Sequence, residues 1–198
     1  MAIEKTNKWA GFSRPTNSIP VDHGKEKLRE LVCYISEKCS TDRTFGKTKL
    51  NKILYFSDFI HFAYYGTPIT GTPYVRLPHG PVPRGIDRIL KKMDGKAIEI
   101  HNPEFYGYEQ HRIVPSRTAN IDSYFKPSQI SLVDGVIKAL WGKTASQVSK
   151  MSHTRAWRIA KKGGVIPYEA IFISDEDVTD YDISRARELS RTYGWSVV

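Results

Sequence analysis

The segment that decides the fold is residues 47–66, KTKLNKILYFSDFIHFAYYG. Its apolar residues recur at helical spacing and form a wide stripe, made of Leu50, Ile53, Leu54, Phe56, Phe59, Ile60 and Ala63. A stripe this wide is typical of a helix that is buried on most sides. Gly66 follows as a helix stop, because glycine readily takes the left-handed conformation. We therefore expect a central helix over 47–65.

Helical spacing also predicts shorter helices on either side of this segment. Their expected ranges are 25–39, 83–93, a stretch from Ser128 to Trp141, 145–151, 153–162, and a last helix near residue 190. Residues that commonly cap helices precede five of them, namely Asp22, Ser128, Thr144, Ser152 and Asp182.

Short strands are expected between these helices. Residues 74–77 carry Tyr and Val and predict one strand, and the following Gly80-Pro81-Val82 predicts a turn into the next helix. Residues 97–101 and 106–114 predict two more strands, joined through Asn102-Pro103. The fold class is therefore α+β, mainly α: a single helical domain with a small antiparallel sheet or β-hairpin.

The ends of the chain differ from its middle. Residues 1–24 are rich in Pro, Gly and polar residues and predict an extended N-terminal arm. Residues 25–170 form the predicted domain. Residues 171–198 hold an acidic segment and the last helix, which we expect to pack on the domain.

Composition describes an ordinary globular protein with a strong positive charge. The chain has 198 residues and a formal net charge of +9, which permits binding to nucleic acid, a membrane surface or an acidic protein. The apolar run within 53–65 is interrupted by Ser57, Asp58 and His61, so it cannot span a bilayer. The N-terminus has no apolar core like that of a signal peptide. We expect a cytoplasmic protein that does not bind membranes.

Cysteine and histidine usage argues against disulfides, metals and cofactors. Cys33 and Cys39 lie six residues apart on one predicted helix, where their side chains point in different directions. The six histidines are scattered, without HxH or HxxxH spacing. We expect no metal site and no cofactor.

The stretch 77–83, LPHGPVP, could place His79 in a catalytic loop, but no nucleophile or carboxylate accompanies it at a recognisable spacing. Its three prolines remove backbone N–H donors, which a phosphate-binding loop needs. The chain also lacks any nucleophile-elbow motif. We therefore predict that the protein is not an enzyme, and that His79 is held in a turn or displayed beside it.

Residues 144–162, TASQVSKMSHTRAWRIAKK, resemble a helix-turn-helix in spacing. Arg155 and Arg158 could then contact operator DNA from a recognition helix. Alternatively, the two helices form a pair with a solvated basic face, and Trp157 packs toward the core. The acidic segment that follows either folds against the basic helices or is solvated.

The run KLNKILYFSDFIHFAYYGTPITGTPYVRLPHGPVPRGIDRIL resembles the core of the Panacea domain, also called the SocA-like or GepA-like antitoxin domain. A second similar piece is Met-Ser-His at 151–153, followed by Trp157. The resemblance covers roughly residues 25–170. The motif residues that it marks as structural are Lys49, Leu50, Tyr55, Phe56, Asp58, Gly80, Pro81 and Trp157.

This resemblance implies a bacterial or phage antitoxin that neutralises a cognate protein toxin by binding it, without catalysis. Members of the family neutralise toxins unrelated to one another, and the SocA branch delivers its toxin to an ATP-dependent protease. The toxin gene is expected next to the antitoxin gene. We expect partner contacts from the loop and the helical pair, at Pro78, His79, Arg84, His153, Arg155 and Arg158.

Overall fold

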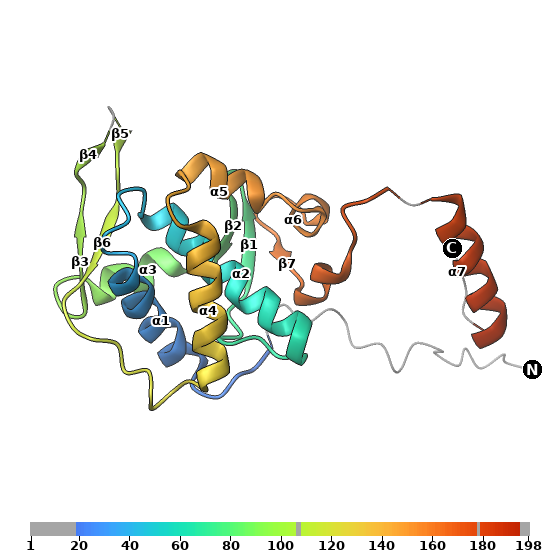
Figure 1. Ribbon diagram of the computed structural model, residues 1–198, viewed down its shortest axis with the longest axis horizontal. Coiled ribbons are helices and arrows are strands. Elements are labelled where there is room, and N and C mark those ends of the chain that lie inside the picture. The colour runs from blue at the N-terminus through green and yellow to red at the C-terminus, as the bar shows by residue number, and fades with distance from the viewer. Residues whose placement is uncertain (1–18, 106–107, 178, 195–198) are drawn as a thin grey trace, which may run out of the picture.

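The computed structural model of the protein describes residues 19–105, 108–177 and 179–194 (Figure 1). The expected central helix is present as α2 (Lys47–Tyr65), and it ends at Gly66, which takes a left-handed φ of 70°. The side chains of Leu50, Ile53 and Phe59 are completely buried, as the wide apolar stripe predicts.

Four helical elements and a strand pack around α2. They are α1 (Gly24–Lys38), α4 (Pro127–Leu140), α5 (Ala145–Met151), the 3₁₀ helix η1 (Tyr168–Phe172) and β2 (Gly80–Pro83). Figure 1 shows α1, α2 and α4 side by side, and together they form the main layer of the domain. The two cysteines lie in this region, where both are buried and free.

A three-stranded sheet covers part of α2. Its order is β2, β1 (Tyr74–Leu77) and β7 (Val165–Ile166), so β1 is the middle strand and both of its pairings are antiparallel. The strand predicted at 74–77 is confirmed. The turn predicted at Gly80-Pro81-Val82 is wrong, because Leu77 pairs with Gly80 and only Pro78 and His79 form the turn. Pro81 and Pro83 are accommodated because β2 is an edge strand, which does not need every N–H group.

The helix expected over 83–93 begins later than predicted. Because Pro83 still belongs to β2, α3 starts only at Ile86 and runs to Met93. The chain turns into this helix at Gly85, which takes a φ of 77°. The redirection that was assigned to the Gly80 turn therefore takes place at Gly85.

A separate ribbon packs beside α1 and α3. Strand β3 (Ile98–His101) pairs antiparallel with β6 (Arg112–Pro115), and a small hairpin of β4 (Glu104–Phe105) and β5 (Tyr108–Glu109) joins them. Figure 1 shows this hairpin extending beyond β3 and β6 at the edge of the domain. The second strand was predicted over 106–114, but the chain forms the extra hairpin first; residues 106–107 lie outside the described residues.

Of the five predicted helix caps, only Thr144 is confirmed. The Thr144 hydroxyl accepts from the N–H of Gln147 at 3.3 Å, and the Gln147 side chain accepts from the N–H of Thr144 at 2.8 Å. At α7 (Asp180–Tyr193) the cap is Thr179, and Asp182 completes the box by accepting from the N–H of Thr179 at 2.9 Å.

The caps predicted for three further helices are wrong as well. The residues that precede α1, α4 and α6 (Arg155–Ile159) are His23, Lys126 and Thr154. Helix α4 begins early because Pro127 fits the first helical position, where its missing N–H is not needed. Ser152 instead follows α5, and its hydroxyl donates to the Ser149 carbonyl at 2.7 Å.

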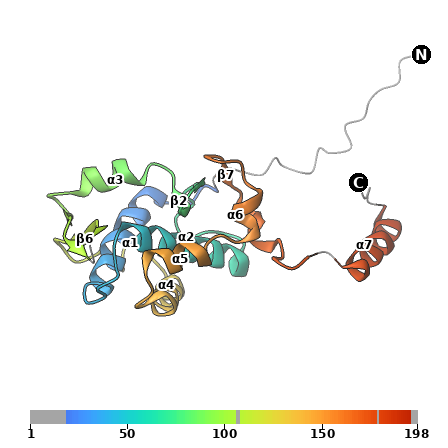
Figure 2. The same ribbon diagram turned by 90° about the horizontal axis from the view of Figure 1, so that it is seen from above.

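The last described helix lies apart from this domain. Of the arm predicted over 1–24, the first eighteen residues lie outside the described residues. Helix α7 buries none of its described side chains, and Figures 1 and 2 show it set apart from the other helices. This arrangement differs from the expected packing on the domain, because the helix offers few aliphatic residues for burial. No helix in the described part of the chain is long and apolar enough to cross a membrane.

Candidate functional site

A groove of about 910 Å³ lies where the N-terminal ends of α2 and α5 meet the β1–β2 turn and the start of β6. Its titratable lining residues are Lys47, Lys49, Lys150, His79, His111 and His153. Thr, Ser and Gln side chains supply most of the remaining surface, and no carboxylate is among its described lining residues. The groove is therefore a site of positive potential that favours an anionic ligand or partner.

The β1–β2 hairpin forms one rim of the groove and carries the exposed His79 at its turn. Gly80 follows with a φ of 97°, a conformation that favours glycine. A Cβ atom here would lie 2.3 Å from the Ser152 hydroxyl and 2.8 Å from the Lys52 amine. Glycine therefore lets the hairpin approach both α2 and the end of α5.

Lys52 of α2 anchors this hairpin through a buried hydrogen bond. Its side chain is 1% exposed, and its amine donates to the Pro81 carbonyl at 2.8 Å. Burial lowers the pKa of Lys52 to about 7, and it has no carboxylate partner within the described residues. Burial thus favours the neutral amine, which is the usual result of burying an unpaired cation.

Lys49, one turn earlier, is also 1% exposed but has an acidic partner. Its amine lies 2.7 Å from an Asp42 carboxylate oxygen and 2.5 Å from the Thr44 hydroxyl. Although burial opposes ionisation, the hydrogen bonds from Lys49 and Thr44 hold the pKa of Asp42 below its usual range. This buried pair joins the start of α2 to the preceding turn.

His153 lines the groove next to the hairpin and stacks on Trp157. Their rings stack with centroids 4.0 Å apart, and the indole N–H donates to the Leu77 carbonyl at 3.1 Å. The Arg76 guanidinium lies over the same indole, 4.3 Å from its centroid. Burial lowers the pKa of His153, and the charge on Lys52 acts in the same direction. His153 is therefore mainly neutral at physiological pH.

The structure brings together only some of the predicted contact residues. His79 and His153 line the same groove, and the exposed Pro78 precedes His79 in the turn. Arg84 is exposed at the end of β2 and is not part of the groove lining.

Arg155 and Arg158 contact the acidic segment instead. Asp175 accepts from the Arg158 guanidinium at 2.8 Å and from the N–H of Arg155 at 2.5 Å. The Arg155 guanidinium also donates to the Glu176 carbonyl at 2.8 Å. Of the two alternatives for the acidic segment, the structure therefore has it folded against the basic helix. A five-residue helix with both arginines engaged does not favour operator reading.

The other motif residues lie beneath the groove or in the core. Leu50 and Tyr55 are buried in α2, whereas Phe56 is only half-buried against the core. Asp58 is buried and accepts from the N–H of Thr70 at 2.7 Å and from the Tyr74 hydroxyl at 2.8 Å. Burial raises the pKa of Asp58, and these hydrogen bonds oppose the shift. Asp58 thus joins α2 to the segment that leads into β1.

Sequence reasoning missed several groove residues, among them Lys47, His111 and Ser149, and also Lys52, which supports the hairpin at its rim. A signal for Lys52 was present, because it directly precedes Ile53 in the wide apolar stripe. No comparable signal marked His111, which comes from a ribbon far away in sequence.

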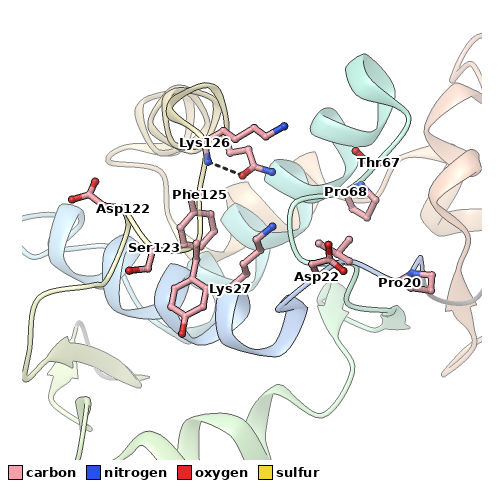
Figure 3. A pocket seen from close by; sticks show the side chains of 12 residues that line it. Pro20, Asp22, Lys27, Thr67, Pro68, Asp122, Ser123, Phe125 and Lys126 are labelled. Atoms are coloured by element: carbon pink, nitrogen blue, oxygen red, sulfur yellow. Dashed lines mark hydrogen bonds between the residues drawn. The ribbon is translucent and has the colours of Figure 1, made fainter.

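A second pocket of about 430 Å³ lies between the start of α1, the end of α2 and the start of α4 (Figure 3). Its lining carries both signs of charge: Asp22, Asp122, Lys27 and Lys126. The dashed line in Figure 3 is the N–H of Lys126 donating to the Gln129 side chain at 3.1 Å. Because its charges balance, this pocket offers no preference for an anion, and the basic groove is the stronger candidate site.

Comparison with models of protein families gives a match over the middle of the chain. Residues 50–158 match the family described as antitoxin SocA-like, Panacea domain. The matched region contains most of α2, the β1–β2 hairpin, α5 and nearly all of α6, so it supplies most walls of the groove. A comparison with curated proteins finds no match.

Proposed function

Because the chain belongs to the SocA-like antitoxin family with a Panacea domain, we propose that it is an antitoxin that binds its cognate toxin directly. The rim of the basic groove is the proposed contact surface. The observation that carries this assignment is that the family-matched region itself builds the hairpin, its Lys52 support and the wall formed by α5. The proposed role requires no chemical step by the antitoxin.

The groove rim has the properties of a docking surface. His79 and Pro78 are exposed at the tip of a hairpin that is held on α2 through Lys52. A rigid contact surface loses little conformational freedom on binding, which favours affinity. Because cationic groups line the groove and carboxylates do not, an acidic toxin surface would associate faster and with better specificity than a basic one.

The proposal is tested by expressing the neighbouring open reading frame alone and together with this chain. We expect growth arrest in the first case and rescue in the second. His79→Glu places a negative charge on the rim and should weaken rescue and toxin binding. His101→Glu is the matched control, because His101 is exposed on β3 outside the groove. A neighbouring gene product that is not toxic would contradict the proposed function. Equal rescue by the two variants would contradict the proposed contact surface.

The same cells distinguish direct neutralisation from delivery to an ATP-dependent protease. Direct binding predicts that the amount of toxin stays the same or rises while growth recovers. If the toxin instead disappears when the antitoxin is expressed, and reappears when the protease gene is deleted, the antitoxin acts as an adaptor and not by direct neutralisation. The measurement is a quantitative immunoblot of tagged toxin.

A further inference from the structure

The N-terminal end of α2 opens into the groove without a capping side chain. Gly46 occupies the cap position, and the N–H of Lys47 donates to the His111 carbonyl at 2.9 Å. Within the described part of the chain, the N–H groups of Thr48 and Lys49 have no acceptor. The first turn also contains no acidic residue, although acids are favoured there. This end of a 19-residue helix therefore presents unsatisfied donors to the groove.

Ser149 on the facing helix is a second, independent sign of a missing ligand. It lines the groove and is 8% exposed, yet its hydroxyl makes no hydrogen bond to any described residue. The hydroxyl is not among the fully buried unpaired side-chain atoms of the described residues, so it can be reached from the groove. A ligand oxygen in the groove would supply that partner.

Lys150 supplies the charge. Of the three lysines in the lining, Lys47 is paired with Asp87 at 2.7 Å and Lys49 with Asp42 at the same distance. Lys150 is exposed and forms no ion pair with any of the described residues. Its positive charge is thus the one not offset by a carboxylate.

We propose that the part of the groove formed by the start of α2, Ser149 and Lys150 binds the phosphate group of a small phosphorylated ligand. Backbone N–H groups at a helix start, a hydroxyl and an ammonium group form the usual donor set for phosphate. No carboxylate among the described lining residues would repel the phosphate. Its volume of about 910 Å³ exceeds that of one phosphate and leaves room for a nucleoside. The inference concerns the isolated chain and stands whether or not a toxin binds at the rim.

The test is calorimetric titration of the purified full chain with pyrophosphate and, separately, with ATP. We expect both to bind, with affinity falling as salt is added. Lys150→Gln should weaken binding roughly tenfold or more, because a hydrogen bond to a charged group is lost. Ser149→Ala should weaken it several-fold. Lys138→Gln is the matched control, since Lys138 is exposed on α4 outside the groove, and it should leave the affinity unchanged.

Amide NMR spectra provide the localising readout and show that each variant is folded. Pyrophosphate should shift the amide signals of Thr48 and Lys49 in the wild-type chain. Tighter binding of ATP than of pyrophosphate would identify a nucleotide as the source of the phosphate, and equal binding would identify phosphate alone. Absence of binding, equal affinities of the Lys150 and Lys138 variants, or stronger binding of a glutamate-rich peptide than of pyrophosphate would overturn the proposal.

Discussion

Two lysines of α2, Lys49 and Lys52, lie one turn apart and are equally buried, but their surroundings differ. Lys49 lies in a polar site with the Asp42 carboxylate and the Thr44 hydroxyl. Lys52 lies under the β1–β2 hairpin, where its only hydrogen-bond partner within the described residues is the Pro81 carbonyl. The same residue type on the same helix therefore has a charged partner in one site and a neutral one in the other.

The difference shows how the neighbours of a buried amine decide its protonation. A buried ion pair keeps both members charged, and removal of one member leaves the other unpaired in the core. A buried amine without an acid avoids that cost by losing its proton, which is why burial lowers the pKa of Lys52 to about 7. The Lys49 site holds the core together, whereas the Lys52 site supports the rim of the groove.

The largest expected effect comes from breaking the pair. Lys49→Met should lower the free energy of unfolding by about 3–5 kcal/mol, because it leaves the Asp42 carboxylate buried without its partner. At pH 7, Lys52→Met should cost less than about 2 kcal/mol, because it removes one hydrogen bond and strands no charge. Urea unfolding of both variants measures the comparison. Equal losses would show that the two sites do not differ in charge state.

A smaller effect is expected where the hairpin meets Lys52. Gly80→Ala should destabilise the protein by about 2–4 kcal/mol, since its Cβ would collide with the Ser152 hydroxyl and the Lys52 amine. Gly85→Ala is the matched control: it has a similar φ of 77° but no atom within 4 Å of the added Cβ. It should cost only the conformational strain of about 1–2 kcal/mol.

Denaturation of these two alanine variants therefore separates close packing from backbone strain. A Gly85→Ala loss as large as that of Gly80→Ala would mean that contact with Lys52 and Ser152 contributes nothing.

Helical spacing and capping residues predicted the helices whose positions depend on neighbouring residues in the sequence. The apolar stripe located α2, and the Thr144 cap located α5. The hairpin at LPHGPVP was read as a turn, because its register depends on contacts with α2 that spacing does not contain. The start of α3 moved to Ile86 for the same reason.

The candidate groove was only partly predictable. His79 and His153 were named from the sequence, but the groove also needs the start of α2 and His111 from the β3–β6 ribbon. These segments are brought together by tertiary packing alone. The sequence left open whether the acidic segment would fold onto the basic residues of α6, and only the structure shows Asp175 bonded to Arg155 and Arg158.

The smallest expected effect is a dependence of stability on pH that belongs to Lys52. Between its folded pKa of about 7 and its ordinary value of 10.5, the unfolded chain holds a proton on this amine that the folded chain lacks. Unfolding then takes up a proton, so the contribution of Lys52 to the unfolding free energy rises with pH, by at most about 1.4 kcal/mol per unit. Below pH 7 both states hold the proton, and the full cost of burying the charge is present.

Unfolding curves of the wild type and Lys52→Met from pH 6.5 to 9 isolate this contribution, because all other titrating groups are shared. The difference in unfolding free energy between the two proteins should change by about 1 kcal/mol per pH unit above pH 7, in favour of the wild type. Parallel curves would mean that the Pro81 carbonyl holds a permanently charged ammonium. In that case the two buried lysines would differ in their partners but not in their charge, and the rim of the groove would be insensitive to pH in this range.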